Sequence, residues 1–295
     1  MTAAAAPGAR LRALLAEGVV AAPGSMNAMF ARMVEQAGFP AVYLSGAGVA
    51  HNLLGVPDVG LTTLTEMAQA ATNMCHAVSI PVVADADTGF GGAANVERTV
   101  RLYEQAGVAA IQLEDQVMPK RCGHFEGKEV VETREMLARL RAAVHARRDP
   151  SFMIVARTDA RSVLGLDEAI RRGLAFAGAG ADAIFVEAPA SDEELDRIGR
   201  ELGATGLPLV ANMVEGGKTP LHSAEELAAM GFRLVIFPGF LMRLTSRAAQ
   251  EGLAELARGL DSRPLLDRML MFDGVQRIVG TDELVARVKS YEEPS

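Results

Sequence analysis

A short segment in the first half of the chain gathers residue types suited to acid–base chemistry. It follows the apolar run 109–113 and holds two acids, two cations, a thiol and an imidazole, namely Glu114, Asp115, Lys120, Arg121, Cys122 and His124. Positive charge near a thiol favours the thiolate, so this spacing predicts a cysteine of lowered pKa. Gly123 lets the backbone bend or approach a ligand closely. The alternative is a solvated, charge-mixed surface loop with an incidental cysteine.

The elements that must position this segment alternate regularly along the chain. Eight short apolar runs predict strands at 19–23, 41–45, 81–87, 109–114, 152–159, 183–187, 208–212 and 234–238. Amphipathic stretches between them predict helices at 27–37, 64–77, 94–106, 134–146, 166–177, 192–202 and 223–230, with Thr133 and Ser223 as N-caps. Continuous apolar strands indicate a sheet buried on both faces, hence parallel strands with crossover helices.

Eight such units in 295 residues predict an α/β fold of the (β/α)₈ type, a TIM barrel. An open doubly wound sheet is the alternative, because the spacing between strands is uneven. A further helix is expected from 239 to 260, and the tail 264–295 is expected to be helical, broken by Gly274 and Gly280. No linker interrupts the chain, so we expect residues 1–295 to form one domain with this C-terminal tail.

Polar residues stand at the ends of six of the predicted strands, where a barrel of this kind builds its active site. They are Ser45-Gly46, Asp85 and Asp87, Glu114 and Asp115, Arg157-Thr158-Asp159, Glu187, and Asn212 with Glu215. Buried charges are costly unless they are paired or metal-bound. Several carboxylates beside one arginine favour a hard divalent cation such as Mg²⁺, with Mn²⁺ also possible. Internal salt bridges from Arg157 to Asp159 or Glu187 are the alternative, and both can coexist.

Composition limits the setting and the partners. The formal net charge of −8 argues against a nucleic-acid partner, which would favour a basic surface. Two cysteines make no disulfide framework and indicate a reducing compartment. The N-terminus lacks the apolar core of a signal peptide, and no apolar run approaches the length of a membrane span. We therefore expect a soluble, cytoplasmic protein without membrane partners.

Taken together, these motifs resemble the isocitrate lyase and phosphoenolpyruvate mutase superfamily. The resemblance runs from Pro23-Gly24 through 43–46, 85–87, 114–116, 156–160 and 212–217, and its most specific part is Lys120-Arg121-Cys122-Gly123-His124. That run is similar to the mobile catalytic loop of the lyase branch, whereas phosphonate mutases and hydrolases generally lack its cysteine. The resemblance implies a Mg²⁺-dependent barrel that forms a homotetramer by exchanging a C-terminal helix between paired subunits.

The resemblance also implies roles for individual residues. Asp85, Asp87 and Glu114 would hold the metal directly or through water, and Cys122 would protonate the aci-carboxylate released by retro-aldol cleavage. Lys120, Arg121 and His124 would position and neutralise that fragment, and Arg157 would pair with a substrate carboxylate. The rest of the substrate pocket would come from Ser45, Gly46, Ala47, Gly123, Glu187 and Asn212.

The substrate implied is a 2-hydroxy di- or tricarboxylate cleaved to pyruvate and a short acid. Val214 stands where methylisocitrate lyases usually carry threonine, and 125–128 also differ, so the chain is more similar to the 2-alkylmalate branch, which cleaves 2,3-dimethylmalate. The alternatives are 2-methylisocitrate cleavage, oxaloacetate hydrolysis or decarboxylation, phosphonate mutase or hydrolase chemistry, and a non-catalytic binding barrel.

Overall fold

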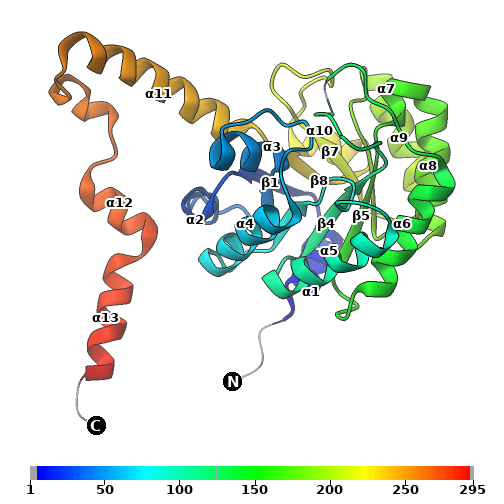
Figure 1. Ribbon diagram of the computed structural model, residues 1–295, viewed down its shortest axis with the longest axis horizontal. Coiled ribbons are helices and arrows are strands. Elements are labelled where there is room, and N and C mark those ends of the chain that lie inside the picture. The colour runs from blue at the N-terminus through cyan, green and yellow to red at the C-terminus, as the bar shows by residue number, and fades with distance from the viewer. Residues whose placement is uncertain (1–4, 124, 293–295) are drawn as a thin grey trace.

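The centre of the molecule is a closed barrel of eight parallel strands in which neighbours in sequence are neighbours in space and β8 pairs with β1 (Figure 1). The computed structural model describes residues 5–123 and 125–292. The strands are β1 Val20–Ser25, β2 Val42–Leu44, β3 Val82–Asp85, β4 Ala110–Glu114, β5 Met153–Thr158, β6 Ala183–Val186, β7 Leu209–Asn212 and β8 Phe232–Phe237. The predicted TIM barrel is therefore confirmed, and closure removes every exposed sheet edge.

The first helix precedes β1, and the others surround the barrel and connect consecutive strands (Figure 1). They are α1 Pro7–Glu17, α2 Ala28–Gln36, α3 Gly46–Val49, η1 Ala50–Leu54, α4 Leu64–Ala77, α5 Ala93–Ala106, α6 Thr133–Ala146, α7 Ala160–Leu164, α8 Leu166–Gly178, α9 Asp192–Gly203 and α10 Ala224–Ala229. The seven helices predicted between strands are present within one or two residues. Ser223 is the N-cap of α10, as predicted, but Thr133 is already helical and Glu132 occupies the cap position of α6.

Two apolar layers hold these elements together. The larger layer lies between the barrel wall and the helices and includes Met67, Tyr103 and Phe176, which are fully buried. The smaller layer fills the barrel interior, where Val20 and Met153 pack with Leu11 of α1. Helix α1 was not predicted from the sequence, and its leucines join the interior layer at the N-terminal end of the strands. The opposite end of the barrel, where the strands finish, carries the polar residues.

The C-terminal arm leaves the barrel along α11 Phe240–Gly259 and continues through η2 Arg263–Arg268, α12 Phe272–Val279 and α13 Thr281–Glu292 (Figure 1). The arm contacts the helices around the barrel again at α2, where the Gln36 side chain donates a hydrogen bond to the carbonyl of Ile278 at 3.2 Å. Large apolar side chains on the arm are exposed, among them Leu253, Leu260 and Phe272. The predicted helical tail is present, and most of its apolar surface is left uncovered by residues 5–123 and 125–292.

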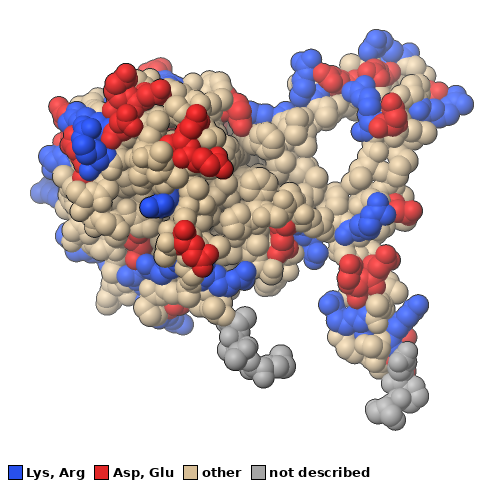
Figure 2. All heavy atoms as spheres, turned by 180° about the vertical axis from the view of Figure 1, so that it is seen from behind, with Lys and Arg blue, Asp and Glu red and all other residues tan. Residues whose placement is uncertain are grey.

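Charges of both signs are interspersed over the face of the molecule seen in Figure 2, on the barrel and on the arm alike. None of the helices in the described ranges combines the length and the apolar character that crossing a bilayer requires.

Candidate active site

The polar strand ends meet in one cavity at the C-terminal end of the barrel. Strand register sets this meeting: Glu114 stands opposite Arg157 across β4 and β5, and Asp85 and Asn212 end β3 and β7. The cavity measures about 190 Å³. Its lining includes the predicted residues Ser45, Ala47, Asp85, Glu114, Lys120, Arg121, Cys122, Gly123, Arg157, Glu187 and Asn212. The structure thus brings together residues spread over most of the chain.

Gly46 is required by close contact. Ser45 caps the short helix α3, where its hydroxyl accepts from the Gly48 N–H at 3.2 Å. The Gly46 N–H donates to Asp85 Oδ2 at 3.3 Å, and a Cβ at Gly46 would lie 2.9 Å from that same oxygen. Only glycine fits here without displacing the carboxylate. The 45–47 backbone is therefore fixed against the acid that ends β3.

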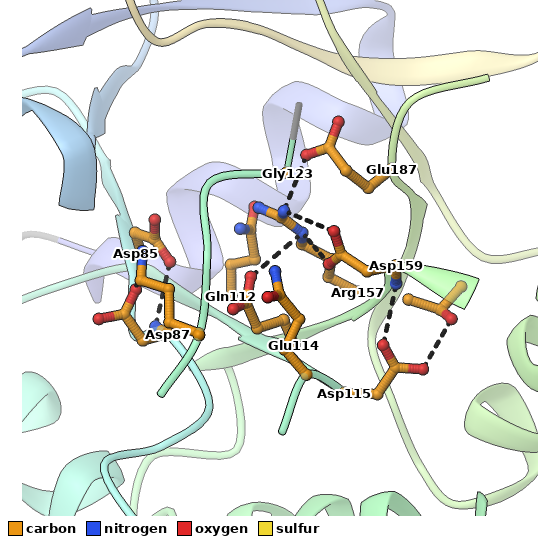
Figure 3. A network of polar contacts seen from close by, with 12 residues as sticks. Asp85, Asp87, Gln112, Glu114, Asp115, Gly123, Arg157, Asp159 and Glu187 are labelled. Atoms are coloured by element: carbon orange, nitrogen blue, oxygen red, sulfur yellow. Dashed lines mark hydrogen bonds and ion pairs between the residues drawn. The ribbon is translucent and has the colours of Figure 1, made fainter. Parts of the chain in front are cut away.

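Asp85 and Asp87 form an acidic pair at one side of the site (Figure 3). The Asp87 N–H donates to Asp85 Oδ1 at 3.1 Å, and Asp87 adopts a left-handed backbone with φ of 47°. Non-glycine residues rarely hold that conformation, and such positions concentrate at functional sites. Burial, with Asp87 as the next cause, raises the pKa of Asp85 to about 6, against the lowering effect of Lys120 and Arg157. The neighbouring cations therefore do not fully compensate the negative charge of the Asp85 carboxylate.

Lys120 anchors the segment after β4 to this acidic pair. Its ammonium lies 2.5 Å from Asp58 Oδ1 and 2.8 Å from Asp87 Oδ1, and all three side chains are almost fully buried. Burial lowers the pKa of Lys120, but the surrounding carboxylates outweigh it and hold the pKa well above its ordinary value. Lys120 therefore stays charged. The ammonium was predicted to neutralise a product fragment, and the structure places it among protein carboxylates.

Arg157 lies at the centre of a second group of acids (Figure 3). Its guanidinium contacts Asp159 at 2.9 Å, Glu187 at 3.1 Å and Glu114 at 3.4 Å. The internal salt bridges considered from the sequence are therefore present, and Arg157 also borders the cavity where a substrate carboxylate could reach it. Asn212 donates to Glu187 Oε2 at 3.2 Å, so the polar wall is continuous from β5 to β7.

Asp115 faces away from the cavity, although it follows Glu114 directly. Its oxygens accept from the Thr158 hydroxyl at 2.7 Å, the Asp159 N–H at 2.9 Å and the Arg172 guanidinium at 2.9 Å. This set fixes the turn after β5, and Asp115 supports the site from behind. Glu215, another predicted strand-end acid, is more exposed and lies 3.7 Å from Arg243.

Cys122 reaches the cavity on a loop with a paired stem. Val117 N–H donates to the Glu129 carbonyl at 2.9 Å, and Gln116 and Val130 form an antiparallel bridge. Gln116 also accepts from the Arg121 N–H and donates to its carbonyl, both at 2.9 Å. Cys122 is partly buried at the cavity wall. His124, predicted to act beside it, lies outside the described residues.

Several cavity residues were missed from the sequence. Tyr43 lies on the floor, where its hydroxyl is 3.3 Å from Gln112 Oε1, and burial followed by Asp85 raises its pKa well above the ordinary value. Asp58 comes from an irregular loop that no strand pattern marks. Met242 and Arg243 come from the first turns of α11. The helix itself was expected from the sequence. Only its position after β8, where a barrel loop reaches the site, could have indicated that its first residues line the cavity.

The acid-to-cation balance tests whether the residues fit a divalent cation. Six buried acids, Asp58, Asp85, Asp87, Glu114, Asp159 and Glu187, face three buried cations, Lys120, Lys128 and Arg157. Burial raises the pKa of Glu114 well above its ordinary value, and Glu114 Oε1 has no hydrogen-bond partner among the described residues. No ready-made cage of three or more acid, cysteine or histidine ligands is present in 5–123 and 125–292. Mg²⁺ is commonly bound through one or two carboxylates with water completing its shell, so the donor set fits.

Comparison with known proteins identifies the family. Residues 11–257 match the family model described as phosphoenolpyruvate phosphomutase. The chain is 47% identical to 2,3-dimethylmalate lyase of Eubacterium barkeri over 94% of this chain and 95% of that protein. It is 46% identical to 2-methylisocitrate lyase of Aeropyrum pernix, covering 89% and 84%. The chain belongs to the phosphoenolpyruvate mutase/isocitrate lyase superfamily.

Solved structures of this superfamily have the same fold along their whole length. A crystal structure of 2,3-dimethylmalate lyase aligns with a TM-score of 0.90 at 39% identity, covering 96% of this chain and 94% of that one. A phosphonopyruvate hydrolase in complex with oxalate and Mg²⁺ aligns with a TM-score of 0.86 at 30% identity, covering 98% and 100%. Superfamily membership makes the protein an enzyme, and its relatives above include two lyases and a hydrolase.

Proposed function

We propose that the protein is a Mg²⁺-dependent carbon–carbon lyase that cleaves a 2-alkylmalate such as 2,3-dimethylmalate to pyruvate and propionate. The observation that carries the proposal is the composition of one cavity, in which Cys122 and the strand-end carboxylates share a wall with apolar side chains. Val214, Ile236 and Phe125 supply that apolar part. An alkyl group placed there would leave water, at a gain of about 0.8 kcal/mol per buried methylene.

Residues of this chain would orient the substrate from two sides. The 45–47 backbone, held against Asp85, would receive the carboxylate beside the hydroxyl-bearing carbon. Arg157 and Asn212 border the same space and offer hydrogen-bond donors to a second carboxylate. Asp85, Asp87 and Glu114 would hold Mg²⁺ directly or through water. When bound, the metal would lower the pKa of the substrate hydroxyl and stabilise the developing carbonyl oxygen.

Cleavage of the C2–C3 bond turns the hydroxyl-bearing fragment into a 2-oxo acid and leaves an electron pair on the other fragment. That fragment is an aci-carboxylate and must gain a proton at carbon. Cys122 is the proposed donor, because it borders the cavity and is not among the proposed metal ligands. The hydroxyl proton passes to solvent, and the Cys122 thiolate regains a proton from solvent before the next turnover, so the overall proton count balances. The adjacent loop residues Arg121 and His124 would help to position the fragment.

Cleavage of 2-methylisocitrate to pyruvate and succinate is the second candidate. Arg243 favours it, because its guanidinium borders the cavity and could pair with the extra carboxylate of a tricarboxylate. Arg243 also lies 3.7 Å from Glu215, which offsets part of its charge. Val214 adds no hydrogen-bond donor for that carboxylate. These two features favour the smaller, more apolar substrate.

We also propose that the protein is a cytoplasmic homotetramer. Exposed leucines and aromatic side chains on the arm would be covered by exchange between paired subunits, as the superfamily resemblance implies. Measuring molecular mass by light scattering tests this assembly. Deletion of residues 264–295 should then give a smaller oligomer, whereas an unchanged mass would contradict exchange through the tail.

Pyruvate release tests the proposed function. 2,3-Dimethylmalate, 2-methylisocitrate, isocitrate and oxaloacetate are compared at matched concentrations with Mg²⁺ and with chelator. We expect 2,3-dimethylmalate to give the highest kcat/KM and chelator to abolish turnover. Faster release from 2-methylisocitrate would reassign the substrate but keep the chemistry. Turnover of a phosphonate in place of all four acids would overturn the lyase proposal.

A further inference from the structure

Lys128 lies at the far end of the Cys122 loop, and the roles proposed above do not use it. Its side chain is almost completely buried, although lysine is rarely buried unless it is paired. Two groups account for the burial. The ammonium lies 2.7 Å from Asp159 Oδ1 and donates to the carbonyl of Gly123. One buried cation thus connects the segment that carries Cys122 to the turn that follows β5.

Gly123 itself is pressed against the reactive wall of the cavity. A Cβ at this position would come within 2.8 Å of Glu187 Cδ and would also collide with the Arg157 guanidinium. The loop therefore packs on Arg157 and Glu187 with no space for a side chain. Because Cys122 precedes Gly123 directly, a shift of the Gly123 carbonyl moves the cysteine backbone with it.

The backbone segment that carries Lys128 is held in place by hydrogen bonds. Lys128 comes directly before the paired stem, in which Val117 bonds Glu129 and Gln116 bridges Val130. At the other end of the contact, Asp159 is fixed by Arg157 through two hydrogen bonds of 2.9 and 3.1 Å. Burial opposes ionisation of Asp159, but Arg157 and then Lys128 outweigh it and hold its pKa at about 2. Asp159 is therefore a permanent anion at neutral pH.

We propose that Lys128 is a positioning residue that holds Cys122 in place for proton transfer, by clamping the Gly123 carbonyl to Asp159. The inference rests on the proposed function for its catalytic meaning. A second link on the same loop, between Glu126 and Lys218, is mostly exposed to solvent. Exposed ion pairs contribute little, whereas a buried charged hydrogen bond contributes substantially. The buried link therefore restrains Cys122 from the Gly123 side, as the two Gln116 bonds to Arg121 restrain it from the other side.

The test compares Lys128→Met with Lys128→Arg and with the matched loop variant Glu126→Gln. The first readout is kcat/KM for pyruvate release. A misplacement of a reacting group by about 1 Å can cost about 10²-fold in rate, so we expect a loss of about that size in Lys128→Met. The loss should fall mainly on kcat, because Arg157 keeps its own contacts with Asp159, Glu187 and Glu114. Lys128→Arg keeps the cation and should recover part of the rate, and Glu126→Gln should stay within about twofold of the wild type.

The second readout needs no lyase activity. Iodoacetamide modifies both cysteines, and peptide mass spectrometry gives the rate at Cys122 and Cys75 separately. Rates are followed over pH to the plateau, so that a change in thiol pKa is separated from a change in access. Loss of the clamp should raise the Cys122 plateau about tenfold. Cys75 lies in α4, where burial raises its pKa to about 12, and its rate should stay unchanged unless the whole barrel loosens.

The outcomes separate the two proposals. Unchanged alkylation of Cys122 in Lys128→Met, with wild-type kcat, would overturn the clamp. A parallel rise at Cys75 would show global loosening and would also overturn it. Faster alkylation at Cys122 alone supports the clamp even if no tested acid is cleaved by the wild type, a result that would reject the proposed function and not the positioning of the loop.

Discussion

Replacing Asp85 with asparagine is expected to stabilise the protein when no metal is bound. The carboxyl titrates near 3.8 when unfolded and near 6 in the fold, mainly because burial and Asp87 disfavour its charge. Between those values the folded protein binds more protons than the unfolded chain, so this group lowers the free energy of unfolding as pH rises through that window. At pH 7.5 the penalty is about 3 kcal/mol, and at pH 5 it is about half of that.

Asparagine removes the charge and also one acceptor oxygen. Asp85 accepts from Gly46 at 3.3 Å and from Asp87 at 3.1 Å, and asparagine can keep one of these bonds with its single oxygen. Losing the other costs about 1 kcal/mol. The net stabilisation expected in Asp85→Asn is therefore about 2 kcal/mol at pH 7.5 and well below about 1 kcal/mol at pH 5.

Urea unfolding in EDTA at fixed protein concentration measures the difference between variant and wild type at both pH values. Saturation with Mg²⁺ at 100 times the dissociation constant should add about 2.7 kcal/mol to the wild type and little to the variant. The sign of the difference should therefore reverse between EDTA and Mg²⁺. A variant less stable than the wild type in EDTA at pH 7.5 would refute the electrostatic reasoning. Equal stabilisation of both proteins by Mg²⁺ would refute the metal assignment.

Three other substitutions test separate parts of the site. Cys122→Ser should lower kcat by about 10²-fold or more, since a hydroxyl is a far weaker acid than a thiol, with KM little changed; wild-type turnover would exclude the proton-donor role. Gly46→Ala should displace the Asp85 carboxylate and weaken Mg²⁺ binding measured by calorimetry, and an unchanged affinity would contradict the contact. Arg172→Met leaves buried Asp115 without its cation and should cost about 3–5 kcal/mol in urea unfolding, with Asp115→Asn in the same chain restoring part of it.

The sequence predicts the barrel because its signal is local and repeated. Each buried strand is a continuous apolar run, and the longer connecting helices have their own period, four of those in the described residues with a side-chain N-cap, so errors at the ends are a residue or two. Helix α1 was not predicted because its three leucines stand among alanines and arginines with little amphipathic pattern. Its packing against the barrel interior depends on tertiary structure. The short helices α3 and α7 are single turns that hold strand-end residues, and no periodicity can mark so few residues.

The site residues on strands were predictable because each strand was predicted and parallel strands bring their C-terminal ends to the same level. Of their partners, Asp159 and Glu187 were considered for Arg157 from the sequence, whereas the partners of Lys120 were not predicted. Asp58 and Lys128 come from loops, and their roles depend on which carboxylates their neighbours already bind. Lys120 shows the limit clearly: its place beside Cys122 in sequence suggested a partner for the thiol, but its ammonium bonds Asp58 and Asp87. Sequence spacing predicts which residues share a loop. The direction of each side chain depends on charged residues that are far away in the sequence.

The paired stem of the Cys122 loop has a consequence for how such enzymes change. Because Val117 and Glu129 are joined by a hydrogen bond, the two ends of the intervening segment are held together whatever lies between them. A replaced, shortened or lengthened segment would leave the strand ends in place, and one that kept Lys120 and Lys128 would also keep their ion pairs with Asp87 and Asp159. Replacement of about a dozen loop residues could thus change the reaction that the enzyme catalyses while the barrel itself stays unchanged. Loop grafting between 117 and 129 would be the laboratory form of that evolutionary step.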